Sequence, residues 1–145
     1  MTDRTMNRRG DLGAVFDAHV KHEFVDHDVE ATMRTMVAEP YVHNVPTLTA
    51  GGIGQAGVRR FYKDQFMGKM PADTKVVRVS RTVGEDQVVD ELILSFTHDV
   101  ELPHVVVMKF AGDKIAHEHI YWDQASLLAQ IGLLDSKVLP VVGAE

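Results

Sequence analysis

The chain has 145 residues and a net charge of −6, with 45% hydrophobic and 25% charged residues. This composition is typical of one globular domain, and a chain of this length buries roughly 70% of its unfolded surface without disulfides or metals. The absence of cysteine excludes disulfides, zinc–thiolate sites and thiol nucleophiles. The acidic charge argues against nucleic acid or an anionic membrane as a partner.

The segment 1–13 is polar and lacks the apolar run of a signal peptide. No segment approaches the roughly 20 apolar residues that a membrane span requires. We therefore expect a cytoplasmic protein that does not enter a membrane.

Helices are predicted in the first half of the chain. From Asp11 onward apolar side chains recur at helical spacing through Phe24. Asp28 stands where it can cap a second, shorter helix that runs to Met36. The segment 39–47 reads as extended, 49–57 as a loop, and 58–66 as a third helix.

The second half changes to the pattern of strands. The segments 74–83, 86–99, 104–111 and 114–122 are rich in β-forming residues and are separated by short turns, one of them near Pro103. Successive strands with short links predict an antiparallel meander. A final short helix begins after Asp123, which can cap it, and stops at Gly132.

This order of elements predicts an α+β fold, in which N-terminal helices cover one face of a curved antiparallel sheet and a short helix follows. We expect a single domain over residues 1–145, with flexible tails at 1–10 and 140–145. A curved sheet closed over helices encloses a mostly apolar pocket, which is the usual place for a small ligand.

Several strings resemble the SnoaL-like family of the nuclear transport factor 2 (NTF2-like) superfamily. They are "YVHNVPTLTAGGIG", "RRFYKDQF", "SRTVGEDQVVDE", "FTHD" and "KIAHEHIYWDQASLLAQIGLLD". The resemblance implies a cone-shaped NTF2-like barrel, a homodimer formed through the outer face of the sheet, and a deep pocket beside the first helix. Because the superfamily includes polyketide cyclases, isomerases, epoxide hydrolases, dehydratases and members without known activity, the fold does not settle the reaction.

The chain departs from this family between "FTHD" and "HVVV". Only four residues separate Asp99 from His104, whereas similar proteins carry a longer segment there. The resemblance therefore implies a trimmed hairpin and a more open rim of the pocket.

Strand alternation alone leaves open which face of 114–122 looks inward, because both faces mix polar and apolar residues. The pocket aspartate of the similar polyketide cyclases corresponds to Ile120. The resemblance therefore implies an inner face made of Ala116, Glu118, Ile120 and Trp122. It leaves an outer face, expected to form the dimer, that carries His117, His119 and Tyr121.

The machinery of known relatives is incomplete here. An arginine and an aspartate of limonene-epoxide hydrolase correspond to Leu92 and Leu94, and the tyrosine that partners its catalytic asparagine corresponds to Val42. That asparagine itself corresponds to Asn44. What the resemblance leaves is an apolar pocket whose polar groups would be Asn44, Asp90, His98 and Glu118.

Glu118 is the first catalytic candidate. Burial in an apolar pocket disfavours the charged form of a carboxylate, which suits a general acid or base. Asp90 and His98 could orient it, and Asn44 or His43 could hold a carbonyl oxygen. The structural alternatives are an ion pair or hydrogen bond that fixes the strand for Glu118, a solvated strand end for His98 and a turn for Asn44.

The pocket wall is predicted from large apolar positions on the inward faces. These substrate-binding candidates are Phe16, Val20, Met33, Tyr62, Leu92, Leu94, Phe96, Ile120 and Trp122. We expect no metal, because the pair His117 and His119 lacks an obvious third ligand, and no cofactor. The polar helical set His19, His22, Glu23, Asp26 and His27 is interpreted as a solvated side with one or two inward groups.

Two functions remain open from sequence. The first is a cofactor-independent acid–base enzyme, a cyclase, isomerase, lyase or hydrolase acting on a hydrophobic molecule with a carbonyl group. The alternative is a non-catalytic module that binds an apolar ligand or dimerises. A macromolecular adaptor is a third reading.

Overall fold

The computed structural model describes residues 2–45, 51–135 and 137, and side chains from Leu12 onward. The chain begins with helices α1 (Thr2–Lys21), η1 (His22–Asp26) and α2 (Val29–Arg34). Strands β1 (Met36–Val45) and β2 (Gly51–Ile53) precede helices α3 (Gly54–Arg60) and η2 (Phe61–Met67). Strands β3 (Lys75–Val83), β4 (Gln87–Phe96), β5 (Val100–Ala111) and β6 (Lys114–Trp122) lead to helix α4 (Gln124–Gln130). The predicted α+β order is thus confirmed.

The strands form one six-stranded sheet in the order β2-β1-β6-β5-β4-β3. Strands β3 to β6 are the predicted antiparallel meander. Strand β1 pairs with β6 in the parallel sense, so the sheet is mixed rather than purely antiparallel. Parallel pairing is available because a long segment, residues 46–113, connects these two strands.

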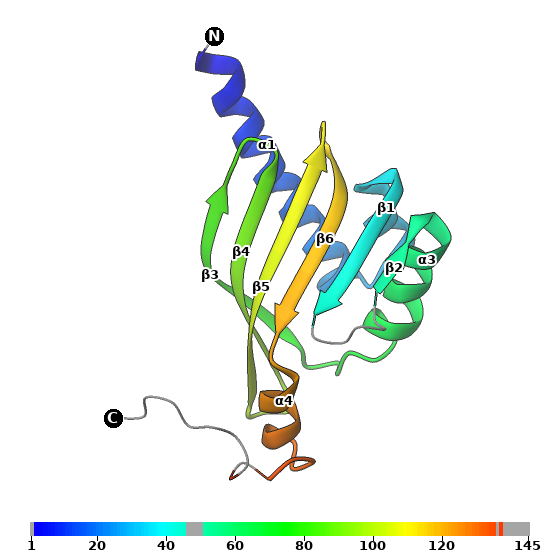
Figure 1. The fold of residues 1–145 in the computed structure, drawn as a ribbon, viewed down its shortest axis with the longest axis vertical. Coiled ribbons are helices and arrows are strands. Elements are labelled where there is room, and N and C mark those ends of the chain that lie inside the picture. The colour runs from blue at the N-terminus through cyan, green and yellow to red at the C-terminus, as the bar shows by residue number, and fades with distance from the viewer. Residues whose placement is uncertain (1, 46–50, 136, 138–145) are drawn as a thin grey trace.

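Helix α1 runs diagonally across one face of the sheet, α3 lies beside β1 and β2, and α4 lies beneath the ends of β5 and β6 (Figure 1). The core lies between α1, α2, η2 and the inner face of the sheet. Its buried members include Leu12, Phe16, Met33, Phe61, Tyr62, Leu92, Met108 and Ile115. One side of the sheet is therefore devoted to core and pocket.

The predicted helix caps are confirmed. Asp28 accepts a hydrogen bond from the backbone N–H of Ala31 at 2.9 Å, and Asp123 accepts one from Ala125 at 3.1 Å. Helix α1 begins at Thr2, well before the predicted Asp11. The expected flexible tail at 140–145 lies outside the described residues.

Two boundaries in the strand region differ from prediction. The turn after β4 is at 97–99, and β5 runs unbroken through Pro103, which pairs with Ile93. A proline is tolerated there because β6 ends opposite His104, so this part of β5 has a strand on one side only. The predicted loop around Gly52 contains the short strand β2. A Cβ atom on Gly52 would lie 2.3 Å from the backbone of Gly57.

The alternation predicted for β6 holds from His117 onward and fails before it. The register between β5 and β6 shifts at Lys109 and Phe110, so one residue of β6 is extra there. As a result Ile115, expected outside, is fully buried in the core, and Ala116, expected inside, is only half-buried. Glu118 and Ile120 are buried as predicted.

Candidate functional site

The most unusual feature of the interior is a cluster of buried polar side chains. His19 lies near the end of α1, Glu23 lies one helical turn later in η1, Tyr62 comes from η2, and Glu118 comes from β6. None of the four is more than 3% exposed. Because burial of such groups without partners is costly, their mutual contacts decide what the cluster can do.

His19 is the centre of the cluster. Its Nε2 lies 3.0 Å from the hydroxyl oxygen of Tyr62, 2.6 Å from Oε1 of Glu23 and 3.4 Å from Oε2 of Glu118. The hydroxyl of Tyr62 donates to Glu118. The four side chains therefore form one electrostatic unit.

The hydrogen-bond partners indicate where protons reside. The hydroxyl of Thr35 donates its proton to the carbonyl oxygen of Thr32, so it must accept from Nδ1–H of His19 at 2.6 Å. The O–H of Tyr62 donates its hydrogen bond to Glu118, so it can only accept from His19. The remaining proton between His19 and the acids is carried either by Nε2 or by Glu23.

The electrostatics favour a charged ring. Burial opposes the charge of His19, but Glu23 and Glu118 outweigh it and raise the pKa of His19 to about 10. Burial raises the pKa of Glu23 to about 7, although His19 acts against this rise. Burial, followed by the charge of Glu118, raises the pKa of Tyr62 well above its usual range. At neutral pH the cluster thus holds an imidazolium, and burial favours a proton on Glu23 more than on an exposed glutamate.

Glu23 has one oxygen that is close to the ring but not hydrogen-bonded. Oε1 is buried and has no hydrogen-bond partner, although it lies 2.6 Å from Nε2 of His19. The two observations agree if the ring N–H points to Tyr62, as the bond to its oxygen indicates. The contact of Glu23 with His19 is therefore mainly an attraction between charges.

The same atoms could be considered for a metal. One ligand atom each from His19, Glu23 and Glu118 lies within 4.8 Å of the others, and imidazole with two carboxylates is a donor set that divalent cations accept. A cation would have to displace the proton of His19, whose pKa is about 10. At pH 7 this costs roughly 4 kcal/mol. We therefore expect a proton rather than a metal ion at the centre of the cluster.

Two adjoining cavities lead toward the cluster. The outer pocket has a volume of about 420 Å³ and an inner cavity about 20 Å³, which is room for about one water molecule. Glu118 and Glu23 line the inner cavity. Residues that line both cavities are Phe66, Leu94, His104 and Ile120. The outer pocket is thus a mostly apolar chamber whose inner end narrows toward Glu118.

Asn44 and Trp122 lie together in the wall of the outer pocket. Trp122 Nε1–H donates to Oδ1 of Asn44 at 2.7 Å. Leu127 of helix α4 and Ile131, which directly follows this helix, belong to the same wall. The side chain of Gln130 forms hydrogen bonds with both the N–H and the C=O of Glu101. Glu101 lies in the part of β5 that extends past the end of β6.

Three predicted catalytic residues lie elsewhere. His43 is on the outer face, in ring contact with His119. His98 is exposed in the turn after β4, with a positive φ of 68°. Asp90 is buried on the inner face but pairs with Arg81, through bonds of 2.7 and 2.8 Å. The expected grouping of Asp90 and His98 with Glu118 is therefore wrong.

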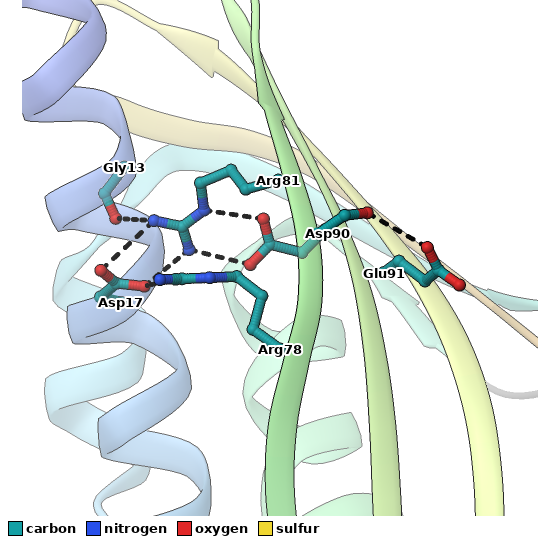
Figure 2. Close-up of polar contacts among 7 residues, drawn as sticks. Gly13, Asp17, Arg78, Arg81, Asp90 and Glu91 are labelled. Atoms are coloured by element: carbon teal, nitrogen blue, oxygen red, sulfur yellow. Dashed lines mark hydrogen bonds and ion pairs between the residues drawn. The ribbon is translucent and has the colours of Figure 1, made fainter.

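Asp90 belongs to a charge network that ties α1 to the sheet (Figure 2). The guanidinium of Arg81 bridges Asp90 on β4 and Asp17 on α1, and it lies 4.9 Å from the ring centre of Phe16. Arg78 also donates to Asp17, at 3.1 Å. The bonds of Asp90 thus serve the packing of the helix on the sheet, beside a separate groove of about 600 Å³.

The residues predicted to form one pocket wall lie in three cavities, in the core and in the polar cluster. Leu94, Phe96, Ile120 and Trp122 line the outer pocket, and Val20 and Leu92 line the inner cavity. Phe16 lines only the separate groove, along with Val20 and Leu92. Met33 is buried in the core, and Tyr62 contacts Glu118 with its hydroxyl.

His19, Glu23 and His104 were not predicted as site residues. A sequence signal existed for the first two, because His19 and Glu23 each follow Phe16 at helical spacing on the face that also carries Leu12. His104 alternates with Leu102 and Val106 on β5, which places it on the inner face. Because ionisable side chains are usually exposed, the sequence did not indicate that these three residues are buried.

The outer face of β1 and β6 carries stacked rings. Tyr41 stacks on His117 with ring centres 4.3 Å apart, and its hydroxyl lies 2.9 Å from Nε2 of His119. Partial burial, followed by the neighbouring His43 and His117, lowers the pKa of His119. The predicted outward direction of His117 and His119 is correct.

Solved structures show the same fold. A candidate SnoaL-like polyketide cyclase from Jannaschia sp. CCS1 aligns with a TM-score of 0.65 at 16% identity, over 80% of this chain and 90% of that one. A hypothetical protein with a ketosteroid isomerase-like fold from Catenulispora acidiphila DSM 44928, in complex with trimethylamine, gives 0.70 at 16%, over 87% and 97%. An NTF2-like protein of unknown function from Burkholderia xenovorans LB400 gives 0.64 at 14%, over 94% and 98%.

The chain therefore has an NTF2-like fold, as its sequence strings indicated. SnoaL-like polyketide cyclases and ketosteroid isomerase-like proteins are among its structural neighbours, all at low identity. No protein-family model and no functionally curated protein matches the sequence. No helix in the described part of the chain combines the length and apolar character needed to cross a membrane.

Proposed function

We propose that this protein is a cofactor-independent acid–base enzyme that binds a small apolar molecule in the outer pocket and moves a proton on it with Glu118. A single arrangement supports this proposal: Glu118 is a buried carboxylate that faces the inner cavity beyond a 420 Å³ apolar chamber. A group held in an apolar site next to bound substrate can act as a general acid or base.

The cluster behind Glu118 supplies what such a group needs. Tyr62 donates to its carboxylate, and the cationic ring of His19 lies 3.4 Å away, so Glu118 is held in one orientation. Glu23, with a pKa raised by burial to about 7, can gain or lose a proton at physiological pH while His19 stays charged. The cluster therefore holds a titratable carboxyl group close to Glu118.

The substrate class follows from the chemistry of the wall. Apolar side chains predominate, with Asn44 as a fixed amide near Trp122. An apolar molecule with a carbonyl group would be held by the wall, and its neighbouring carbon would lose or gain the proton. The inner cavity of about 20 Å³ admits only the reacting end of such a molecule, and only after side chains move.

Proton abstraction is tested by hydrogen–deuterium exchange next to a carbonyl. Cyclic ketones such as 2-tetralone are incubated in D2O with the protein, and loss of the α-proton signal is followed by NMR. We expect the wild type to accelerate exchange, Glu118→Gln to abolish the acceleration while keeping ligand binding, and Glu91→Gln, on the exposed outer face, to have no effect. Equal exchange by Glu118→Gln and the wild type would remove Glu118 from the mechanism.

The small volume of the inner cavity favours a second function, non-catalytic binding of an apolar ligand. Under this alternative the outer pocket holds the molecule and Glu118 only stabilises the fold. Binding of ketones by the wild type without exchange would support it.

We also infer that two copies pair through the outer sheet face, where Val105 and Tyr121 are 40% and 43% exposed and lie opposite each other.

A further inference from the structure

His104 stands at the junction of the two cavities. It lies on β5 between Leu92 of β4 and Trp122 of β6, and it lines both the outer pocket and the inner cavity. Only 8% of its surface is exposed. A molecule that reaches from the outer pocket toward Glu118 therefore comes close to this imidazole, along with Phe66, Leu94 and Ile120.

The hydrogen bonds of His104 determine which of its nitrogens carries the proton. Nδ1 lies 2.8 Å from the carbonyl oxygen of Leu102, and a carbonyl can only accept, so Nδ1 carries a hydrogen. Burial lowers the pKa of His104, and the bond to Leu102 offsets this only in part. The ring is therefore neutral at physiological pH, and its Nε2 is an acceptor with a lone pair.

The ring is held in one orientation. It stacks on Trp122 with ring centres 5.9 Å apart and planes 19° from parallel. Trp122 is itself fixed by its bond to Asn44. Among the described residues no group donates a hydrogen bond to Nε2 of His104. A rigid, nearly buried acceptor in a pocket wall selects what binds beside it, because a ligand without a donor leaves it unsatisfied.

We propose that Nε2 of His104 is a ligand-binding group that accepts a hydrogen bond from a hydroxyl group of the bound molecule. This inference rests on the proposed function, and it narrows the substrate class to apolar carbonyl compounds that also carry a hydroxyl group, either as an alcohol or phenol or in the enol form. The hydroxyl lies at His104, and the rest of the molecule occupies the apolar outer pocket. The same contact places the atoms next to the hydroxyl near the inner cavity and Glu118.

A pair of matched probes tests the inference. In 2-methoxynaphthalene a methyl group replaces the hydroxyl hydrogen of the aromatic alcohol 2-naphthol. The ether therefore cannot donate a hydrogen bond, and the rest of the two molecules is the same. Dissociation constants from protein NMR titrations should favour the alcohol on the order of 10- to 100-fold in the wild type. On binding, the ¹⁵N resonance of Nε2 should shift with the alcohol and stay in place with the ether.

Variants separate the acceptor from the ring. His104→Phe keeps an aromatic ring on Trp122 and should bind both probes equally. His104→Gln restores an acceptor oxygen and should recover part of the preference. His43→Phe, the same change on the outer face, should keep all of it. Thermal unfolding of each variant verifies that it is folded, and the Nε2 resonance in the wild type gives an answer even if His104→Phe does not fold.

The outcomes distinguish this inference from the proposed function. If the wild type binds both probes with equal affinity, the pocket is real but His104 does not select a hydroxyl, and the inference is overturned. If His104→Phe keeps the preference, a different group provides it, and the inference is again overturned. If neither probe binds, the proposed apolar pocket fails and this inference fails with it.

Discussion

The buried charge of His19 predicts that raising the pH destabilises the protein. Its pKa is about 10 in the folded state against 6.5 for the free side chain, so the folded protein keeps a proton that the unfolded chain loses. The stabilisation is complete below about pH 6.5 and disappears as the pH rises through about 10. The full difference corresponds to roughly 5 kcal/mol.

The measurement is best made at pH values above the pKa of Glu23, which burial raises to about 7. At lower pH the titration of Glu23 also makes the free energy of unfolding fall as the pH rises, so the two contributions would overlap. Between about pH 7.5 and 9.5 we expect the free energy of unfolding in urea to fall by roughly 3 kcal/mol, or about 1.4 kcal/mol for each pH unit. His19→Gln should be less stable and nearly insensitive to pH in this window. His43→Gln, at an exposed position, should keep the slope of the wild type.

Two results would refute this reasoning. One is a free energy of unfolding that stays constant across the window in the wild type. The other is an NMR titration in which the ring of His19 loses its proton near pH 6.5. The second measurement uses only the wild type, so it remains decisive if His19→Gln does not fold.

Further predictions concern the charge network and the outer face. Asp90→Asn should lower the free energy of unfolding by about 3 kcal/mol, because the side chain of Asp90 is 1% exposed, whereas Asp17→Asn, at a side chain 56% exposed, should cost under about 1 kcal/mol. If the two variants lost the same free energy of unfolding in urea, the argument that the buried ion pair of Asp90 contributes more than the exposed one of Asp17 would be wrong. Sedimentation should show a dimer for the wild type and a monomer for Val105→Glu, which places a charge in the proposed contact beside Tyr121. A monomeric wild type at high micromolar concentration would rule out the contact.

The order of helices and strands was readable from the sequence because it depends on local periodicity. Leu12 and Phe16 repeat at helical spacing, and Asp28 and Asp123 cap helices with their own side chains. The inward direction of Glu118 was predicted from strand alternation together with the family resemblance, and the structure agrees.

What surrounds Glu118 could not be read in this way, because its neighbours come from distant parts of the chain. His19 and Tyr62 reach it from α1 and η2 only after these helices pack on the sheet. Asp90 points inward like Glu118, but its carboxylate pairs with the guanidinium of Arg81 on the neighbouring strand.

The sequence by itself determined the class of fold, the caps and the alternation of the strands apart from the start of β6, since each follows from residues near one another in the chain. Only the tertiary structure decided which polar groups meet, which acids lie beside His19 and which nitrogen of His104 bonds the backbone. The physical reason is that burial and charge pairing act over a few ångströms in space, whatever the separation along the chain.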